Sequence, residues 1–138
     1  MSGLDRLPRT WMRSPAGADL EVIQAEGLRS RMVGLLGARG LPERTALLIP
    51  RCDSVHTVGM RFALDVVFAR RSDPAGPLEI VAVHPEVRPG RFARVRRRGT
   101  GMRRRELCAL ELAAGQAGEL GLTAGVLLEP SERPTVSP

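Results

Sequence analysis

The sequence predicts an α+β domain: a curved, mostly antiparallel sheet or small β-barrel of about six strands, with two short helices. Several short segments alternate between apolar and polar or small residues, as half-buried strands do. Turn-forming residues separate these segments at short intervals, which favours hairpins and therefore antiparallel pairing. The 138 residues suffice for one hydrophobic core, and 43% of them are apolar, an ordinary value for a folded domain.

The first half of the chain predicts strands on either side of one helix. Leu28, Met32 and Leu35 recur at helical spacing. A short apolar run before Pro50 is typical of a buried strand. In chain order, we expect a loose N-terminal lead at residues 1–17, with a short strand near Trp11. A strand at 20–25, a helix at 28–36 and a further strand at 46–49 follow.

The centre of the chain, residues 52–68, reads CDSVHTVGMRFALDVVF and holds the clearest strand signal. Every second residue from Phe62 on is large and apolar, and the intervening residues are small or apolar except for Asp65. Residues 62–70 are therefore predicted as a strand, and 52–60 as a polar loop that leads into it. A carboxylate on such a strand must be exposed or held by partners, because an unpaired buried charge is costly.

The second half of the chain predicts three more strands and a second helix. Residues 74–77, Pro-Ala-Gly-Pro, form a turn, so the alternating segment 78–83 is expected to pair antiparallel with 62–70. His84 is expected at the end of that strand. The remaining elements are a strand, a short helix, a last strand and a flexible tail, at residues 106–113, 114–120, 126–128 and 130–138.

Three segments resemble a known family. The string VHTxGMRFxLDVVF, at residues 55–68, is similar to the central motif of the domain of unknown function 192 (DUF192) family. Two shorter pieces agree, the GLLGxR and LELxxGxA segments, at residues 34–39 and 110–117. Ala63 stands where the family often has proline, and Val126 where an aspartate is common. The resemblance covers residues 18–129 and implies a compact domain rich in β-structure with short helices, which favours closure into a barrel.

The chain is expected to form a single domain over residues 18–129, in the cytoplasm. No stretch approaches the roughly 20 apolar residues that span a bilayer. The N-terminus lacks the continuous apolar region of a signal peptide. Cys52 and Cys108 are therefore expected to be thiols rather than a disulfide.

Positive charge is concentrated in one segment. The chain has 21 basic residues, all arginines, against 15 acidic residues, and residues 88–105 hold nine of the arginines and no acidic residue. Arginine binds phosphate or carboxylate well, and residues 99–101, Gly-Thr-Gly, predict a hairpin tip or loop within the segment. We therefore expect a basic hairpin. It is either a solvated surface or an anion-binding surface formed by Arg96, Arg97, Arg98, Arg103, Arg104 and Arg105.

The polar loop and Asp65 also supply chemically reactive groups. Cys52, His56 and Asp65 could act as nucleophile, base and orienting carboxylate, so a small enzyme is one alternative. Cys52 and His56 could instead supply two zinc ligands, but their spacing is loose, and we predict no metal and no other cofactor. A further alternative is structural: His56, Thr57 and Asp65 form a hydrogen-bond network that fixes the loop to the sheet.

We predict a non-catalytic binding module with two surfaces. The first is a polar pocket around the motif, lined by His56, Thr57, Met60, Arg61, Asp65 and Glu111. The second is the basic hairpin, which would bind a small or anionic ligand or the acidic surface of a partner protein. A weak nucleic-acid binder that uses residues 94–105 is an alternative, disfavoured because aromatic residues are only 3% of the chain and base stacking would be poorly served.

Overall fold

The structure, a computed structural model, describes residues 7–25 and 40–135. The strands in these residues are β1 (Arg9–Arg13), β2 (Asp19–Gln24), β3 (Thr45–Pro50), β4 (Ser54–His56), β5 (Leu64–Arg70), β6 (Leu78–Val87), β7 (Phe92–Arg94), β8 (Leu107–Ala113) and β9 (Leu127–Ser131). The helices are a short α-helix, α2 (Gln116–Glu119), and a 3₁₀-helix, η2 (Arg104–Glu106). Neither helix is long and apolar enough to cross a membrane.

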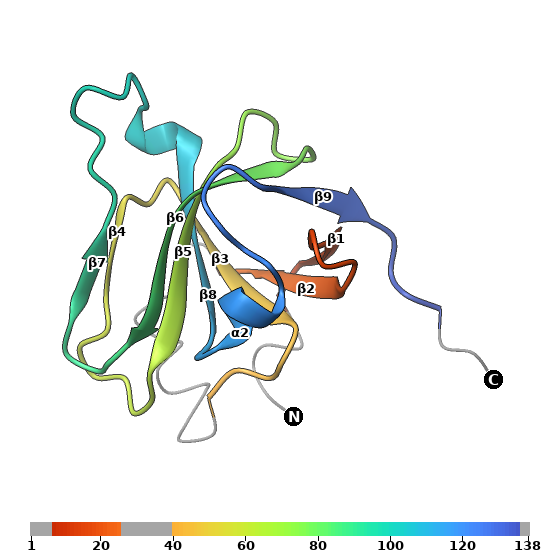
Figure 1. The fold of residues 1–138 in the computed structure, drawn as a ribbon, viewed down its shortest axis with the longest axis horizontal. Coiled ribbons are helices and arrows are strands. Elements are labelled where there is room, and N and C mark those ends of the chain that lie inside the picture. Colours follow the sequence, from red (N-terminus) through yellow and green to blue (C-terminus); the bar gives the residue numbers. More distant parts are fainter. Residues whose placement is uncertain (1–6, 26–39, 136–138) are drawn as a thin grey trace.

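Seven strands close into a barrel, in the order β1, β2, β3, β8, β5, β6, β9, and β4 pairs with β7 in a separate two-stranded ribbon beside it (Figure 1). The predicted small barrel is therefore confirmed, with more strands than the expected six. The α+β class is only roughly right, because the described part of the chain is mostly β with one α-helix. The helix predicted over residues 28–36 lies outside the described residues.

The predicted strands are present with shifted ends. β5 begins at Leu64 rather than Phe62, and β6 runs on to Val87, so His84 lies within a strand and not at its end. β9 includes Pro130 and Ser131, the first residues of the predicted tail. The prediction missed β4 and β7, because three residues are too few for an alternating pattern to be recognised.

Pairing in the barrel is antiparallel except between β2 and β3, which run parallel. β5 lies between β6 and β8. The predicted antiparallel pairing of residues 62–70 with 78–83 is therefore confirmed. The motif strand thus pairs with both of its neighbours from Leu64 to Arg70.

Alternation along the strands places apolar side chains on both the inner and the outer face of the barrel. Val67 and Leu110 belong to the barrel interior, to which all seven barrel strands contribute apolar side chains. Phe68, on the opposite face of β5, packs with Val55 of β4 and Ala93 of β7. Full burial of a side chain such as Phe68 contributes about 1.5–3 kcal/mol. The ribbon is therefore held against the outside of the barrel by apolar contacts.

The two ends of the barrel are covered by different elements. α2 and the residues after it cover one end, where Ala117, Leu120 and Leu122 are buried in the interior core. The β5–β6 turn and η2 lie at the opposite end, at the top of Figure 1. Within the part of the chain that the structure describes, no α-helix covers this second end.

Cys108 lies on β8 inside the barrel and is 1% exposed. Burial raises the pKa of its thiol from 9.0 to about 12, and the positive charge of Arg71 offsets this effect only in part. Cys52 and Cys108 are both free thiols, as the sequence predicted. The folded protein therefore strongly favours the neutral form of Cys108.

We expect alkaline pH to destabilise the fold through Cys108. Because its pKa is higher in the folded than in the unfolded state, its contribution to stability is complete below pH 9.0 and is lost as the pH rises toward about 12. The free energy of unfolding should fall by about 2 kcal/mol between about pH 8 and pH 10.5, as measured by denaturant unfolding. The chain has no lysine or tyrosine to obscure this effect.

Two variants isolate the contribution of Cys108. Cys108→Ala should lose about 2 kcal/mol less than the wild type over that pH range, whereas Cys52→Ala should retain the Cys108 contribution. The same loss in Cys108→Ala as in the wild type would show that the buried thiol is not responsible.

Candidate functional site

Asp65 is fully buried on β5, and its carboxylate accepts two hydrogen bonds from the backbone. Oδ1 accepts from the amide of Glu86 at 2.9 Å, and Oδ2 accepts from the amide of Ala117 at 2.8 Å. The two donors lie 21 and 52 residues away along the chain. Hydrogen bonds to a charged group contribute roughly 1.5–3 kcal/mol each. Asp65 therefore links three segments that are distant in sequence.

The first of these contacts lies at a bulge in β6. The register between β5 and β6 shifts by one residue opposite Asp65, which leaves Pro85 and Glu86 facing one residue of β5. Pro85 has no N–H to donate to the ladder, and Glu86 adopts a left-handed conformation with φ of 49°. By accepting the Glu86 N–H, Asp65 satisfies a donor that the bulge would otherwise leave unpaired.

The second contact holds α2 over the end of the barrel. The first N–H groups of a helix have no partner within the helix, and Asp65 accepts that of Ala117. Gln116 is 4% exposed, and its Oε1 accepts from the amide of Arg44, just before β3, at 2.8 Å. Its Nε2 donates to Glu119 Oε2 at 2.9 Å. A helix of four residues is too short to be stable alone, so these side chains keep it in place.

Thr57 fixes the turn that leads into β7. Its buried Oγ1 donates to the carbonyl of Arg88 at 2.6 Å and accepts from the amide of Arg91 at 2.8 Å. The backbone of Thr57 also bonds to this turn, with its N–H donating to the Arg91 carbonyl and its carbonyl accepting from Gly90. Thr57 therefore orders the first residues of the arginine-rich segment 88–105.

The structure places three other predicted ligand-binding residues apart from Asp65. His56 is exposed on β4, and its ring lies 6.2 Å from that of Phe92 on β7, with a tilt of 58° between the two planes. Met60 is buried in a small apolar cluster with Leu64. Arg61 is exposed. His56 therefore belongs to the outer face of the ribbon, whereas Met60 belongs to the core.

Glu111, the last residue of the predicted polar pocket, is 2% exposed on β8. It pairs with Val66 of β5, whereas Asp65 pairs with Leu112. Directly paired residues of an antiparallel ladder point to the same face, and successive residues point to opposite faces. Asp65 and Glu111 therefore lie on opposite faces of the sheet, and the register does not bring them into one pocket.

The residues of the enzyme alternative make separate contacts. The Cys52 thiol donates to the carbonyl of Ser54 at 3.0 Å. Both carboxylate oxygens of Asp65 accept from backbone amides, and His56 lies on the exposed face of the ribbon. Within residues 7–25 and 40–135, no group of three His, Cys, Asp or Glu side chains is arranged to hold a metal ion.

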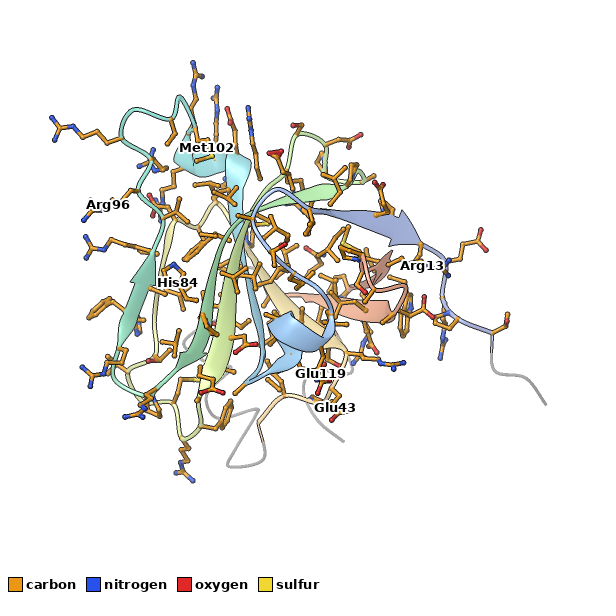
Figure 2. All side chains as sticks on the ribbon, in the orientation of Figure 1. Arg13, Glu43, His84, Arg96, Met102 and Glu119 are labelled. Carbon is orange, nitrogen blue, oxygen red and sulfur yellow. The ribbon has the colours of Figure 1, made fainter. Side chains whose placement is uncertain are left out.

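An open groove of about 630 Å³ follows the ribbon and the arginine-rich segment. Its walls come from the strand ends and the loop beyond β7, namely Asp53, Ser54, Phe92, Arg94, Val95, Arg97, Arg98 and Met102. Residues 95–103 form a loop and not the paired strands of the predicted hairpin. Figure 2 shows long side chains with nitrogen tips extending outward from this side of the molecule, Arg96 among them. We call this feature the basic groove.

Asp53 organises the arginines of the basic groove. Its Oδ2 accepts from Arg97 Nε at 2.8 Å, and its Oδ1 lies 3.7 Å from Arg104 Nε. The six arginines predicted to bind anions are therefore not all in one place. Arg97 and Arg98 line the groove, and Arg104 lies beside the Asp53 carboxylate. Arg105 lines a separate cavity, and Arg96 and Arg103 are exposed outside both.

The sequence prediction missed the ribbon residues of the groove. Asp53, Ser54 and Phe92 were not among the predicted binding residues. The available signal was the alternation of exposed and buried residues around Val55 and Ala93, which is only three residues long in each strand. Such a short pattern identifies a surface only after the pairing of the two strands is known.

We expect Asp65→Asn to lower the free energy of unfolding by about 3 kcal/mol. The asparagine oxygen can accept one of the two N–H groups, but its NH₂ group then faces the other donor. Denaturant unfolding measures the loss. Asp73→Asn is the matched control, because Asp73 accepts the amide of Ala75 in an exposed turn, where asparagine can make the same bond. The control should lose less than about 0.5 kcal/mol, and equal losses would contradict the structural role of Asp65.

Two solved structures resemble the fold. One is a protein from Sinorhizobium meliloti 1021 with a provisional description as a transcription regulator, at 23% identity over 88% of this chain and 92% of that chain, with a TM-score of 0.60. The other is a protein of unknown function from Novosphingobium aromaticivorans DSM 12444, at 14% identity over 91% of this chain and 85% of that chain, with a TM-score of 0.62. At these identities the similarity shows the fold alone.

No curated protein matches the chain in sequence. The family model DUF192, described as an “Uncharacterized ACR”, matches residues 11–129, which contain the three segments that resembled this family. These residues begin within β1 and end within β9, and so include at least part of every strand of the barrel and the ribbon. The chain therefore belongs to the DUF192 family.

Proposed function

We propose that this protein is a non-catalytic binding module that takes an acidic segment of a partner protein into its basic groove. The observation that supports this function best is the charge of the groove, whose walls include three arginines and one aspartate. A guanidinium group can bind a carboxylate through two parallel hydrogen bonds. A partner segment with several carboxylates would therefore be complementary to the groove.

The ion pair between Asp53 and Arg97 gives the groove order as well as charge. Arg97 is held at 2.8 Å by a carboxylate from the neighbouring loop. Arg94 and Arg98 are exposed on the same surface and form no ion pair within the described residues. A partially ordered surface loses less conformational entropy on binding. Arg94 and Arg98 are therefore the arginines that we assign to direct contact with the partner.

The ribbon adds an aromatic contact beside these arginines. Phe92 is 68% exposed and also lines the basic groove, and the ring of His56 lies next to it. Aromatic residues and arginine are enriched in protein interfaces. We assign Phe92 to an apolar contact with the partner, flanked by the charged contacts of the groove.

The motif supports this surface from outside the groove. Thr57 fixes the turn before Phe92, and Asp65 fixes the bulge that precedes that turn. We therefore assign a structural role to Thr57 and Asp65, in place of the polar pocket expected around the motif. The enzyme alternative receives no support from the hydrogen bonds of Asp65, because both of its oxygens bind backbone amides.

A nucleic-acid ligand is the second candidate. The Sinorhizobium meliloti protein shares the fold and is provisionally described as a transcription regulator, which favours this candidate. The basic groove would contact phosphates, but Phe92 is the one aromatic residue in its walls. Single strands rely on several stacking platforms, so the acidic peptide remains the preferred ligand.

Fluorescence anisotropy with a labelled peptide rich in Glu and Asp tests the proposal. The double variant Arg94→Ser with Arg98→Ser should weaken binding at least about tenfold, because two charge-assisted hydrogen-bond donors are lost. The matched control is Arg88→Ser with Arg91→Ser, which removes the same charge from the same segment outside the groove walls. The control should weaken binding less than about threefold.

Two results would contradict the proposal. Equal weakening by both double variants would mean that net charge, and not the groove, attracts the peptide. Tighter binding of a single-stranded oligonucleotide than of the peptide at the same salt concentration, lost in the Arg94/Arg98 variant, would identify the second candidate as the function.

A further inference from the structure

We propose that the open end of the barrel binds a small amphipathic carboxylate, a molecule with an apolar body and one anionic group. The site lies at the barrel end opposite α2 and shares no wall residue with the basic groove. It consists of two adjoining cavities, one mainly apolar and one rich in arginine. The inference is therefore independent of the proposed function of the groove.

The apolar part is a cavity of about 360 Å³ in the mouth of the barrel. β1 contributes Trp11 and Met12 to its wall, and the interior side chains Leu48 and Leu78 form its floor. The β5–β6 turn covers it from one side with Ala75. Its volume falls at the lower end of the range for small-molecule sites, and barrel mouths are common positions for such sites. The cavity therefore suits the apolar body of a small ligand.

The anion-binding part is a cavity of about 270 Å³ that shares Arg71 with the first. Arg51 and Arg105 also line it, and none of the three arginines forms an ion pair within the described residues. Its one carboxylate belongs to Glu106, which lies 3.3 Å from Arg70 Nε and is therefore already paired. Three arginines thus line a small cavity whose one carboxylate is already paired with Arg70.

Arg51 is held at this cavity in an unfavourable backbone conformation. Its φ is 51°, in the left-handed region, which is sterically unfavourable for a residue other than glycine. The next residue, Cys52, donates its amide to the carbonyl of Leu107 at 3.1 Å, so the surrounding backbone fixes this conformation. Strained residues of this kind are concentrated at binding and catalytic sites.

Arg71 is positioned to serve both cavities. Its backbone amide donates to the carbonyl of Glu106 at 2.8 Å, which fixes the start of the turn after β5. Arg71 lines both cavities, and its positive charge lowers the pKa of the Cys108 thiol, which burial raises to about 12. A ligand whose apolar body fills the barrel mouth would place its anionic end beside Arg71, where the second cavity begins.

Isothermal titration calorimetry with octanoate tests the site. Of two further probes, 1-octanol lacks the charge and acetate lacks the apolar body. Octanoate should bind saturably, and each of the two partial probes should bind at least about tenfold more weakly. Octyl phosphate distinguishes the anionic groups: binding no tighter than that of octanoate supports a carboxylate ligand. Binding of octyl phosphate much tighter than that of octanoate would overturn the carboxylate assignment. Equal binding of 1-octanol and octanoate would overturn the role of the arginines.

Variants and chemical-shift mapping locate the binding. Arg71→Gln and Arg51→Gln should each weaken octanoate binding about tenfold or more. Arg13→Gln changes an exposed arginine that lines neither cavity, and it should not change the binding. Ala75→Leu narrows the mouth and should also weaken it. Amide shifts in octanoate titrations should appear at β1 and the β5–β6 turn. Shifts confined to β4, β7 and residues 95–98 would place octanoate in the basic groove and overturn the inference.

Discussion

The two hydrogen bonds accepted by Asp65 set the geometry of one end of the molecule. An isolated carboxylate inside a barrel would be strongly destabilising, and here each oxygen receives one backbone N–H, from Glu86 and from Ala117. Asp65 belongs to the VHTxGMRFxLD motif and Ala117 to the LELxxGxA segment. Two of the stretches that identify the family therefore meet in a single contact, which holds a short helix over the barrel.

The same contact influences the surface where the arginines gather. Asp65 stabilises the bulge near the end of β6, and the chain then turns through residues 88–91, which Thr57 fixes by side-chain and backbone hydrogen bonds. β7 and the arginine loop follow directly. The motif therefore supports a basic groove to whose walls it contributes no residue. The scaffold and the two proposed binding sites are separate: the motif holds the fold, and the walls of both arginine-lined sites lie outside it.

Much of the barrel could be predicted from the sequence, because β5, β6 and β8 alternate over enough residues to reveal their faces. Asp65 was recognisable as a charged residue on an apolar strand. Its partners were not, because backbone amides 21 and 52 residues away carry no side-chain signal. The ribbon was missed since each of its strands has three residues. The polar pocket expected around Asp65 and Glu111 depended on strand register, which the sequence alone does not determine.

Native-state hydrogen exchange, followed by NMR, tests most directly whether Asp65 holds these segments together. The amides of Glu86 and Ala117 lie in a bulge and at the start of a four-residue helix, where fast exchange is the ordinary expectation. If Asp65 binds both, the two amides should exchange as slowly as Val67 in the centre of β5, through unfolding of the whole domain. Exchange as fast as that of Gly99 in the arginine loop would contradict this role of Asp65.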